Sequence, residues 1–106
     1  MFTRQGYRNA RQYKMAILSR LEHGEFSGSI NSLARDIETS SNLKTTVHHY
    51  DETYPVPNEA NDYFRAIVDM LAEEDYITLR RDIASYNVHI AITDKGISEL
   101  RTSNVD

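Results

Sequence analysis

Apolar residues recur at helical spacing in two long segments of the chain. In residues 9–22 they fall on one side of a helix, namely Ala10, Tyr13, Ile17, Leu18 and Leu21. In residues 59–74 they again fall on one side, namely Ala60, Phe64, Ile67, Val68 and Leu71. His23 and Gly24 end the first helix in the usual way, and Asn58 is expected to cap the second. The pattern therefore predicts two amphipathic helices with buried apolar faces.

A shorter helix is predicted between these two. Ser29 or Asn31 offers its N-cap, and the helix is expected to end near Thr39. Residues 25–30, just before it, have room for one short strand. Residues 40–57, just after it, are polar and end in two closely spaced prolines, which cannot continue a helix interior. We therefore expect a loop or an extended connector there.

The last third of the chain predicts a β-hairpin. Residues 76–81 and 87–93 are rich in β-branched and aromatic residues, as strands are, and residues 82–86 connect them. Arg80 and Arg81 are consecutive, so their side chains are expected to leave opposite faces of the hairpin. The strand alternation places Ile77 and Leu79 toward the core on the face of Arg81. A last short helix is expected over residues 97–101.

Two short motifs mark the ends of this hairpin. Residues 71–77, Leu-Ala-Glu-Glu-Asp-Tyr-Ile, resemble the Leu-x-x-x-Gly-aromatic/aliphatic-Ile signature where the third helix of MarR-type and related winged-helix regulators passes into the wing. Residues 92–96, Ile-Thr-Asp-Lys-Gly, resemble the Leu-Thr-x-x-Gly that closes the wing and starts the next helix. The resemblance covers residues 9–101. It implies an α+β winged helix, with a three-helix core, a C-terminal two-stranded β-hairpin wing and a short extra strand.

The chain departs from that family at two places. Asp75 stands where the family has glycine, at a helix end that often needs a left-handed backbone, which Asp tolerates better than most residues. The connector, residues 40–57, is much longer than the roughly 3–4 residues of a helix-turn-helix. A helix over residues 42–50 would make that segment the better DNA reader, with Lys44 and Thr45 among its contacts. Its β-branched run disfavours a helix.

The charge of the chain is unevenly distributed. The domain is expected to span residues 9–101, between a loose basic arm over residues 1–8 and a frayed tail over residues 102–106. Residues 1–20 carry five basic groups and no acidic one, whereas residues 21–77 carry three basic and twelve acidic groups. A basic end on an acidic body is typical of a nucleic-acid footprint, and a solvated amino-terminal helical turn is the alternative.

Composition argues for a cytoplasmic protein without membrane contact. The chain contains no cysteine, which excludes disulfides and thiolate metal sites. No apolar run approaches the ~20 residues that a membrane span needs. The basic amino terminus is not followed by the apolar segment of a secretory signal.

No pattern of catalytic or metal-binding residues stands out. His48 and His49 are adjacent and would point apart, and the other two histidines, His23 and His89, lie far away in sequence, so no zinc-ligand spacing results. There is no Gly-rich phosphate loop and no Gly-x-Ser-x-Gly motif. Tyr13, Tyr63 and Tyr76 fit core or core-edge positions, and Tyr86 is expected at the hairpin tip. The sequence predicts no enzyme, no metal site and no cofactor.

Binding is therefore the expected function, and the resemblance implies duplex DNA bound by a homodimeric regulator. The candidate contacts are Asn61 and Arg65 on bases, Arg80 and Arg81 on phosphates, Lys44 and Thr45 in the connector, and Arg4, Arg8 and Arg11 in the arm. Asp62 and Asp69 flank Arg65 at helical spacing and are expected to hold it within the helix. The alternative is a protein–protein interaction module whose acidic third helix docks a protein partner.

Overall fold

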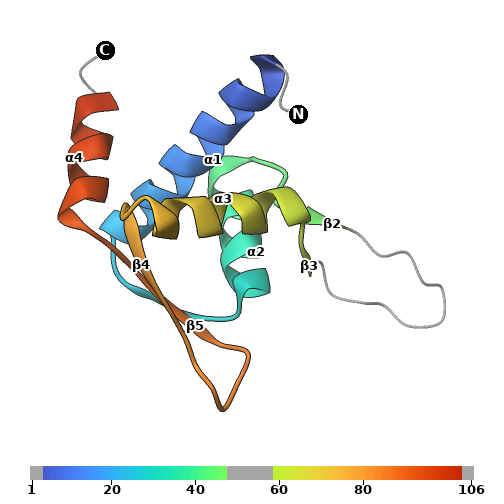
Figure 1. The fold of residues 1–106 in the computed structure, drawn as a ribbon. Helices are drawn as coiled ribbons and strands as arrows, with labels where there is room; N and C mark the ends of the chain where they lie inside the picture. Colours follow the sequence, from blue (N-terminus) through green and yellow to red (C-terminus); the bar gives the residue numbers. More distant parts are fainter. Residues whose placement is uncertain (1–3, 48–58, 104–106) are drawn as a thin grey trace.

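The computed structural model describes residues 4–47 and 59–103. Over these ranges the chain has an α+β fold, as predicted. Its elements are α1 (Arg4–Glu22), β1 (Phe26–Gly28), α2 (Ile30–Ser41), β2 (Thr46–Val47), β3 (Glu59–Ala60), α3 (Asp62–Glu73), β4 (Ile77–Arg81), β5 (Val88–Ile92) and α4 (Asp94–Ser103). In Figure 1, α1 and α4 extend to one side of the molecule, and the β4–β5 hairpin extends to the opposite side.

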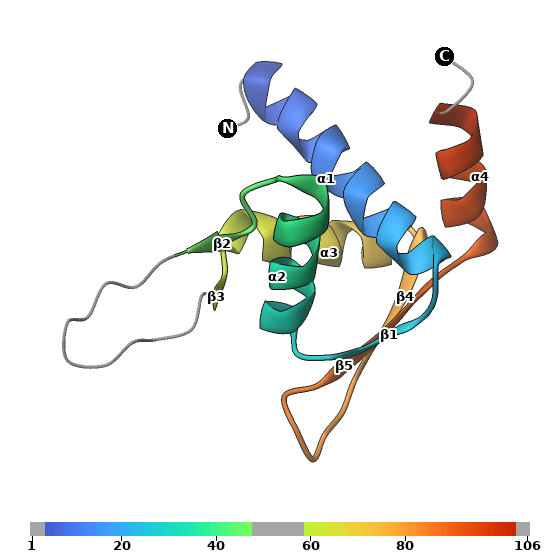
Figure 2. The same cartoon turned by 180° about the vertical axis from the view of Figure 1, so that it is seen from behind.

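The strands form two small antiparallel sheets. The larger sheet has the order β1-β5-β4, so that Ile90 of β5 pairs with Phe26 of β1 on one side and with Leu79 of β4 on the other. Strands β2 and β3 form a separate pair in which Thr46 lies opposite Ala60. Figure 2 shows β1 running beside β5, which ties the chain just before α2 to the hairpin. The predicted short strand and the predicted hairpin are both confirmed.

One apolar core joins the helices to the larger sheet. Its buried residues are Tyr13, Ile17, Leu18, Leu21, Phe26, Leu33, Ala34, Ile37, Ala60, Phe64, Ile67, Val68, Leu71, Ile77, Val88, Ile90 and Leu100. The apolar faces predicted for the two long helical segments are buried throughout, apart from Ala10, which packs against the edge of the core. Each large side chain buried in this way stabilises the fold by about 1.5–3 kcal/mol.

Helix α3 begins later than predicted. Asn61 caps it in place of Asn58, because its Oδ1 accepts a hydrogen bond from the Phe64 N–H at 2.7 Å. Glu59 and Ala60 form β3 instead of the first helical turn. Pairing with β2 gives their backbone groups hydrogen-bond partners, which the N–H groups of a first helical turn lack. Asn58 itself lies outside the described residues.

Helix α1 begins earlier than predicted. It starts at Arg4, so residues 4–8 are helical and do not form the expected loose arm. Positions 4, 8 and 11, which all hold arginine, therefore belong to one continuous helix. At the other end of the chain, α4 extends to Ser103, beyond the predicted end at residue 101. Residues 1–3 and 104–106 lie outside the described part of the chain.

The connector is extended where the structure describes it. Helix α2 ends at Ser41, and Asn42 adopts a left-handed conformation with φ of 58°. The helical interpretation of residues 42–50 is therefore wrong for residues 42–47, and the rest of that segment lies outside the described residues. The Glu38 carboxylate explains the extended path: it accepts the Thr45 N–H at 3.3 Å and the Thr46 hydroxyl at 2.7 Å.

The two motifs at the ends of the hairpin meet in space. Asp75 has a φ of 65°, the left-handed conformation expected at the family's glycine position. The Thr93 hydroxyl donates to the Asp75 carbonyl at 2.5 Å and accepts the Gly96 N–H at 3.1 Å. A Cβ atom on Gly96 would overlap the Tyr76 carbonyl oxygen. The close approach of α4 to the start of β4 thus requires glycine at this position.

Candidate nucleic-acid interface

A hollow lies where the start of α2, the face of α3 and the β4–β5 hairpin meet. It encloses about 230 Å³. Its lining residues are Ser29, Ile30, Asn31, Arg65, Arg81, Tyr86 and Val88. The hollow brings together two of the arginines that the sequence singled out, although they are far apart along the chain.

The start of α2 is held in place by its own side chains. Ser29 is the N-cap: its hydroxyl oxygen accepts the Ser32 N–H at 3.1 Å, which satisfies one of the free donors of the first turn. The Asn31 side chain reaches across to the next segment, where its Oδ1 accepts the Ala60 N–H at 3.0 Å. Asn31 therefore joins α2 to β3, just before α3 begins.

Arg65 of α3 is anchored at the same place. Its Nη2 donates to Asn31 Oδ1 at 3.0 Å, and its Nε donates to the Ala60 carbonyl at 3.4 Å. The Arg65 side chain is nevertheless exposed, so its guanidinium lies in the hollow with one side toward solvent. The sequence predicted that Asp62 and Asp69 of the same helix hold Arg65. The two acceptors described here instead belong to α2 and β3.

Arg80 and Arg81 leave opposite faces of the hairpin, as the strand alternation predicts. Ile77 is buried and Leu79 half-buried on the face of Arg81, and Arg81 Nη2 lies 3.6 Å from Asp69 Oδ1 of α3. Arg80 pairs across the strands with His89 on the other face. Both arginines also line a second, open hollow beside the hairpin tip. The hairpin thus carries one guanidinium on each side.

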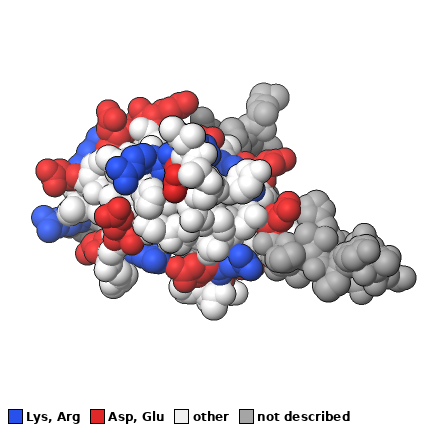
Figure 3. Space-filling model, turned by 90° about the horizontal axis from the view of Figure 1, so that it is seen from below, with Lys and Arg blue, Asp and Glu red and all other residues white. Residues whose placement is uncertain are grey.

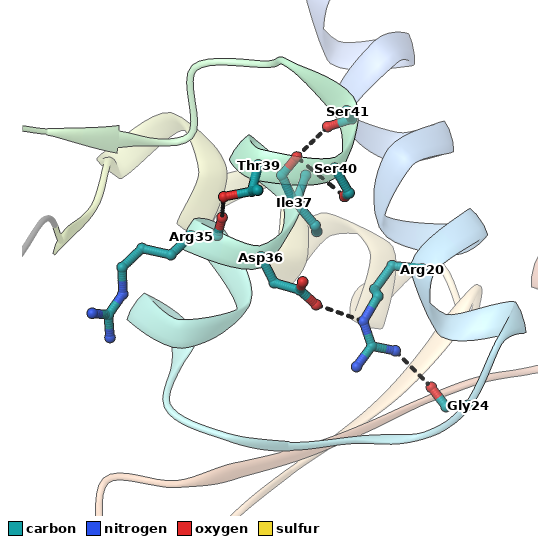
Figure 4. A network of polar contacts seen from close by, with 8 residues as sticks. All are labelled: Arg20, Gly24, Arg35, Asp36, Ile37, Thr39, Ser40 and Ser41. Carbon is teal, nitrogen blue, oxygen red and sulfur yellow. Dashed lines mark hydrogen bonds and ion pairs between the residues drawn. The ribbon is translucent and has the colours of Figure 1, made fainter.

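Arg35 adds a cation that the sequence reasoning did not select. Arg20 of α1 donates to Asp36 Oδ2 at 2.7 Å and to the Gly24 carbonyl at 3.2 Å, which joins α1 to α2. In Figure 4, Arg35 points away from this network. Its Nε donates to the Asn31 carbonyl at 3.3 Å, so its guanidinium lies beside the first turn of α2. The sequence could have indicated this contact, because residues four apart, such as Asn31 and Arg35, are neighbours on a predicted helix.

Two predicted contact residues are used inside the fold. Asn61 is not an outward-facing base reader: its Oδ1 caps α3, and its Nδ2 donates to the Lys44 carbonyl at 3.2 Å. Thr45 is fully buried, with its hydroxyl donating to the Ala34 carbonyl. Both are therefore corrections to the predicted site. At the junction of two elements, backbone N–H and C=O groups need hydrogen-bond partners, and a polar side chain located there supplies them. Its hydrogen-bonding groups are then not available to a ligand.

The remaining predicted contacts lie elsewhere. Lys44 is exposed, and its carbonyl accepts from Tyr13 and Asn61. Arg11 is exposed on α1. The amino-terminal end of α1, where Arg4 and Arg8 are located, lies on the side opposite the hairpin tip in Figures 1 and 2. The amino-terminal end of α1 therefore lies away from the β4–β5 hairpin.

Acidic groups are interspersed with these cations. Asp62 and Asp69 are exposed on α3, and Asp69 is the partner of Arg81. Figure 3, seen from the side of the hairpin tip, shows blue and red atoms next to one another around a white central area. The interface is therefore not a uniformly basic surface, and any phosphate that binds must compete with Asp69 for Arg81.

The hairpin turn is organised by Asp82. Its Oδ1 accepts the Ala84 N–H at 3.0 Å and its Oδ2 accepts the Ser85 hydroxyl at 3.1 Å. These two hydrogen bonds hold the pKa of the Asp82 carboxyl below its ordinary value of 3.8, the bond from Ala84 having the larger effect. The charged carboxylate is therefore part of the turn at neutral pH. Elsewhere, burial raises the pKa of Tyr13.

Within residues 4–47 and 59–103, no group of three or more His, Asp or Glu side chains is arranged to hold a metal ion. None of the helices described there is long and apolar enough to cross a membrane. Comparisons with protein families, with curated proteins and with solved structures find no match for this chain.

Proposed function

We propose that this chain is a winged-helix protein that binds duplex DNA, with the β4–β5 hairpin as the wing and α3 as the helix presented to the major groove. The observation that carries the proposal is the hollow at which the start of α2, Arg65 of α3 and Arg81 of the wing converge. Three separate elements supply groups that suit a phosphate: a capped helix start and two guanidiniums. Contact with the sugar–phosphate backbone of the DNA is therefore the main source of affinity in this proposal.

Base reading is a smaller part of the proposal. Arg65 is the outward cation of α3 with the chemistry to recognise guanine. Its present contacts with Asn31 and Ala60 hold the side chain at the amino-terminal half of α3, the half that enters the groove in proteins of this type. Asn61 caps the helix and is therefore not part of the proposed base contact. The resemblance also implies a homodimer, which sedimentation of the purified chain would test directly.

The test is a charge reversal on the wing. Arg80→Glu together with Arg81→Glu is expected to weaken binding to all duplex sequences alike and to flatten the salt dependence by about one to two counterions. Fluorescence anisotropy with a random-sequence duplex at about 50 mM and about 200 mM salt measures both effects. Arg101→Glu, a single charge reversal, is the control for non-specific charge effects, because Arg101 is exposed on α4, which extends away from the hairpin. Absence of duplex binding by the unmodified chain at the lower salt would overturn the proposal.

A second candidate function is docking of a protein partner on α3. Asp62 and Asp69 are both exposed there, and they favour a basic partner over a polyanion. The two proposals predict opposite changes in binding for one pair of substitutions. Asp62→Lys with Asp69→Lys is expected to strengthen duplex binding if DNA is the ligand. The same pair of substitutions is expected to abolish binding of a basic protein partner.

A further inference from the structure

The tip of the β4–β5 hairpin exposes two large apolar side chains. Ile83 is fully exposed and Tyr86 is 97% exposed. Among the described residues, the only other exposed large hydrophobic side chain is Val47, at 40%. Leaving Ile and Tyr in water at a tip forgoes the burial energy that each would otherwise contribute. Two such residues in one turn at the end of a projecting element indicate a surface that is buried in a complex.

The turn that carries them is well ordered by hydrogen bonds. In addition to the two bonds that Asp82 accepts, its N–H donates to the Asn87 carbonyl at 3.0 Å. The Ser85 hydroxyl oxygen accepts the Asn87 N–H at 3.3 Å. These bonds hold Ile83 and Tyr86 in an outward position before any ligand arrives. A preorganised tip loses little conformational entropy on binding, which favours insertion into a narrow site.

The two arginines next to the tip indicate the kind of site into which the tip inserts. Arg80 and Arg81 lie on opposite faces of the hairpin, and the hollows beside the tip are lined by one or both of them. A DNA minor groove is about 6 Å wide and has a row of phosphates along each edge. A thin element with an apolar end and a cation on each side is complementary to such a groove.

We propose that Ile83 acts as an apolar wedge that the hairpin inserts between base pairs from the minor groove, with Tyr86 covering the opened step. This inference rests on the proposed DNA binding and adds the groove and the mode of contact. Apolar side chains inserted in this way unstack a base step and kink the duplex. Pyrimidine–purine steps such as TA are the easiest to unstack, so they are the expected position of the wedge. The Asp82 carboxylate is exposed at the tip, where it accepts two hydrogen bonds from the turn.

The experiment uses a duplex of about 20 base pairs with 2-aminopurine at a central TA step, whose fluorescence rises when the base loses its stacking. The unmodified chain is expected to bind and to raise the fluorescence. Ile83→Ala is expected to bind about tenfold more weakly and to lose the fluorescence rise, while the salt slope is unchanged. Val47→Ala, which alters the other exposed apolar side chain, is expected to change neither quantity. Thermal unfolding of each variant confirms that it is folded.

The outcomes separate the two proposals. Duplex binding that persists in Ile83→Ala with the same affinity and the same fluorescence rise overturns the wedge and leaves the proposed function standing. Failure of the unmodified chain to bind any duplex at low salt overturns both. Binding to phosphatidylcholine–phosphatidylglycerol vesicles that Ile83→Ala abolishes, without duplex binding, assigns the tip to a lipid surface and overturns the wedge.

Discussion

Arg81 of β4 forms an ion pair with Asp69 of α3, with Nη2 and Oδ1 3.6 Å apart. The pair bridges the hairpin and the third helix, the two elements that the proposed function uses. Both side chains are more than half exposed, at 68% and 57%. An exposed pair of this kind contributes about 0–1 kcal/mol to stability, so its main effect is on the charge available at the hollow.

Removing the carboxylate is therefore expected to help DNA binding. Asp69→Asn takes away one like charge near the phosphates and frees Arg81, and we expect duplex affinity to rise about fivefold, or ~1 kcal/mol. Anisotropy titration at low salt measures the change. The gain should shrink in an Arg81→Gln background, because part of it comes from the freed guanidinium. An equal gain in both backgrounds would contradict the proposed competition for Arg81.

The core prediction concerns Leu71. This side chain is fully buried near the end of α3, and Leu71→Ala is expected to cost about 2–5 kcal/mol of unfolding free energy. Denaturant unfolding followed by circular dichroism measures the loss. Ile83→Ala removes a comparable amount of side chain from an exposed site and should leave stability nearly unchanged. A Leu71→Ala variant as stable as the parent would mean that the helix is rotated from the orientation described above.

Gly96 is predicted to be intolerant of even one added carbon. In Gly96→Ala the new Cβ meets the Tyr76 carbonyl and the Ile92 side chain, so α4 must move away from β4. We expect a loss of about 1–3 kcal/mol, seen as a lower Tm. Ser98→Ala, at an exposed position on the same helix, is the control and should not lower the Tm. An unaffected Tm in Gly96→Ala would show that the junction is less tightly packed than this.

The carboxyl of Asp82 is predicted to titrate below its ordinary value of 3.8. Because its pKa is lower in the folded chain than in the unfolded one, its contribution to stability is complete above the unfolded pKa. That contribution is lost as the pH falls through the folded pKa. Ser85→Ala removes one donor and should raise the pKa toward the ordinary value, as an NMR titration of the side-chain carboxyl would show. Thr102→Ala on α4 should leave it unchanged, and an unaltered pKa in Ser85→Ala would exclude Ser85 as a donor to the carboxylate.

The sequence predicted the elements well where a periodic pattern or a turn residue decides the backbone. The helical spacing of apolar residues identified the buried faces of α1 and α3, and Leu71 is buried as expected. The strand alternation placed Arg80 and Arg81 on opposite faces, since side chains alternate across any strand. Asp75 adopts the left-handed conformation that its position in the motif required.

The candidate site was less predictable, because it depends on contacts between segments distant in the chain. Asn61 and Thr45 have the right chemistry for a ligand, yet the fold uses their polar groups to join the connector to α2 and α3. Asn31 lines the hollow and Arg35 lies beside the first turn of α2, whereas the sequence indicated only a possible cap for Asn31 and no contact for Arg35. DNA binding, the homodimer and the absence of catalysis stay predictions.

The sequence by itself determined which residues face inward and where the hairpin turns, because those properties follow from local backbone geometry and the 3.6- and 2-residue periods. Only the tertiary structure decided that Glu59 and Ala60 pair with β2, since a strand partner is supplied by another segment. It alone also decided that Arg65 and Arg81 line one hollow and that Asp69 is the ion-pair partner of Arg81. Distances between segments are set by how the core packs, and no local pattern encodes them.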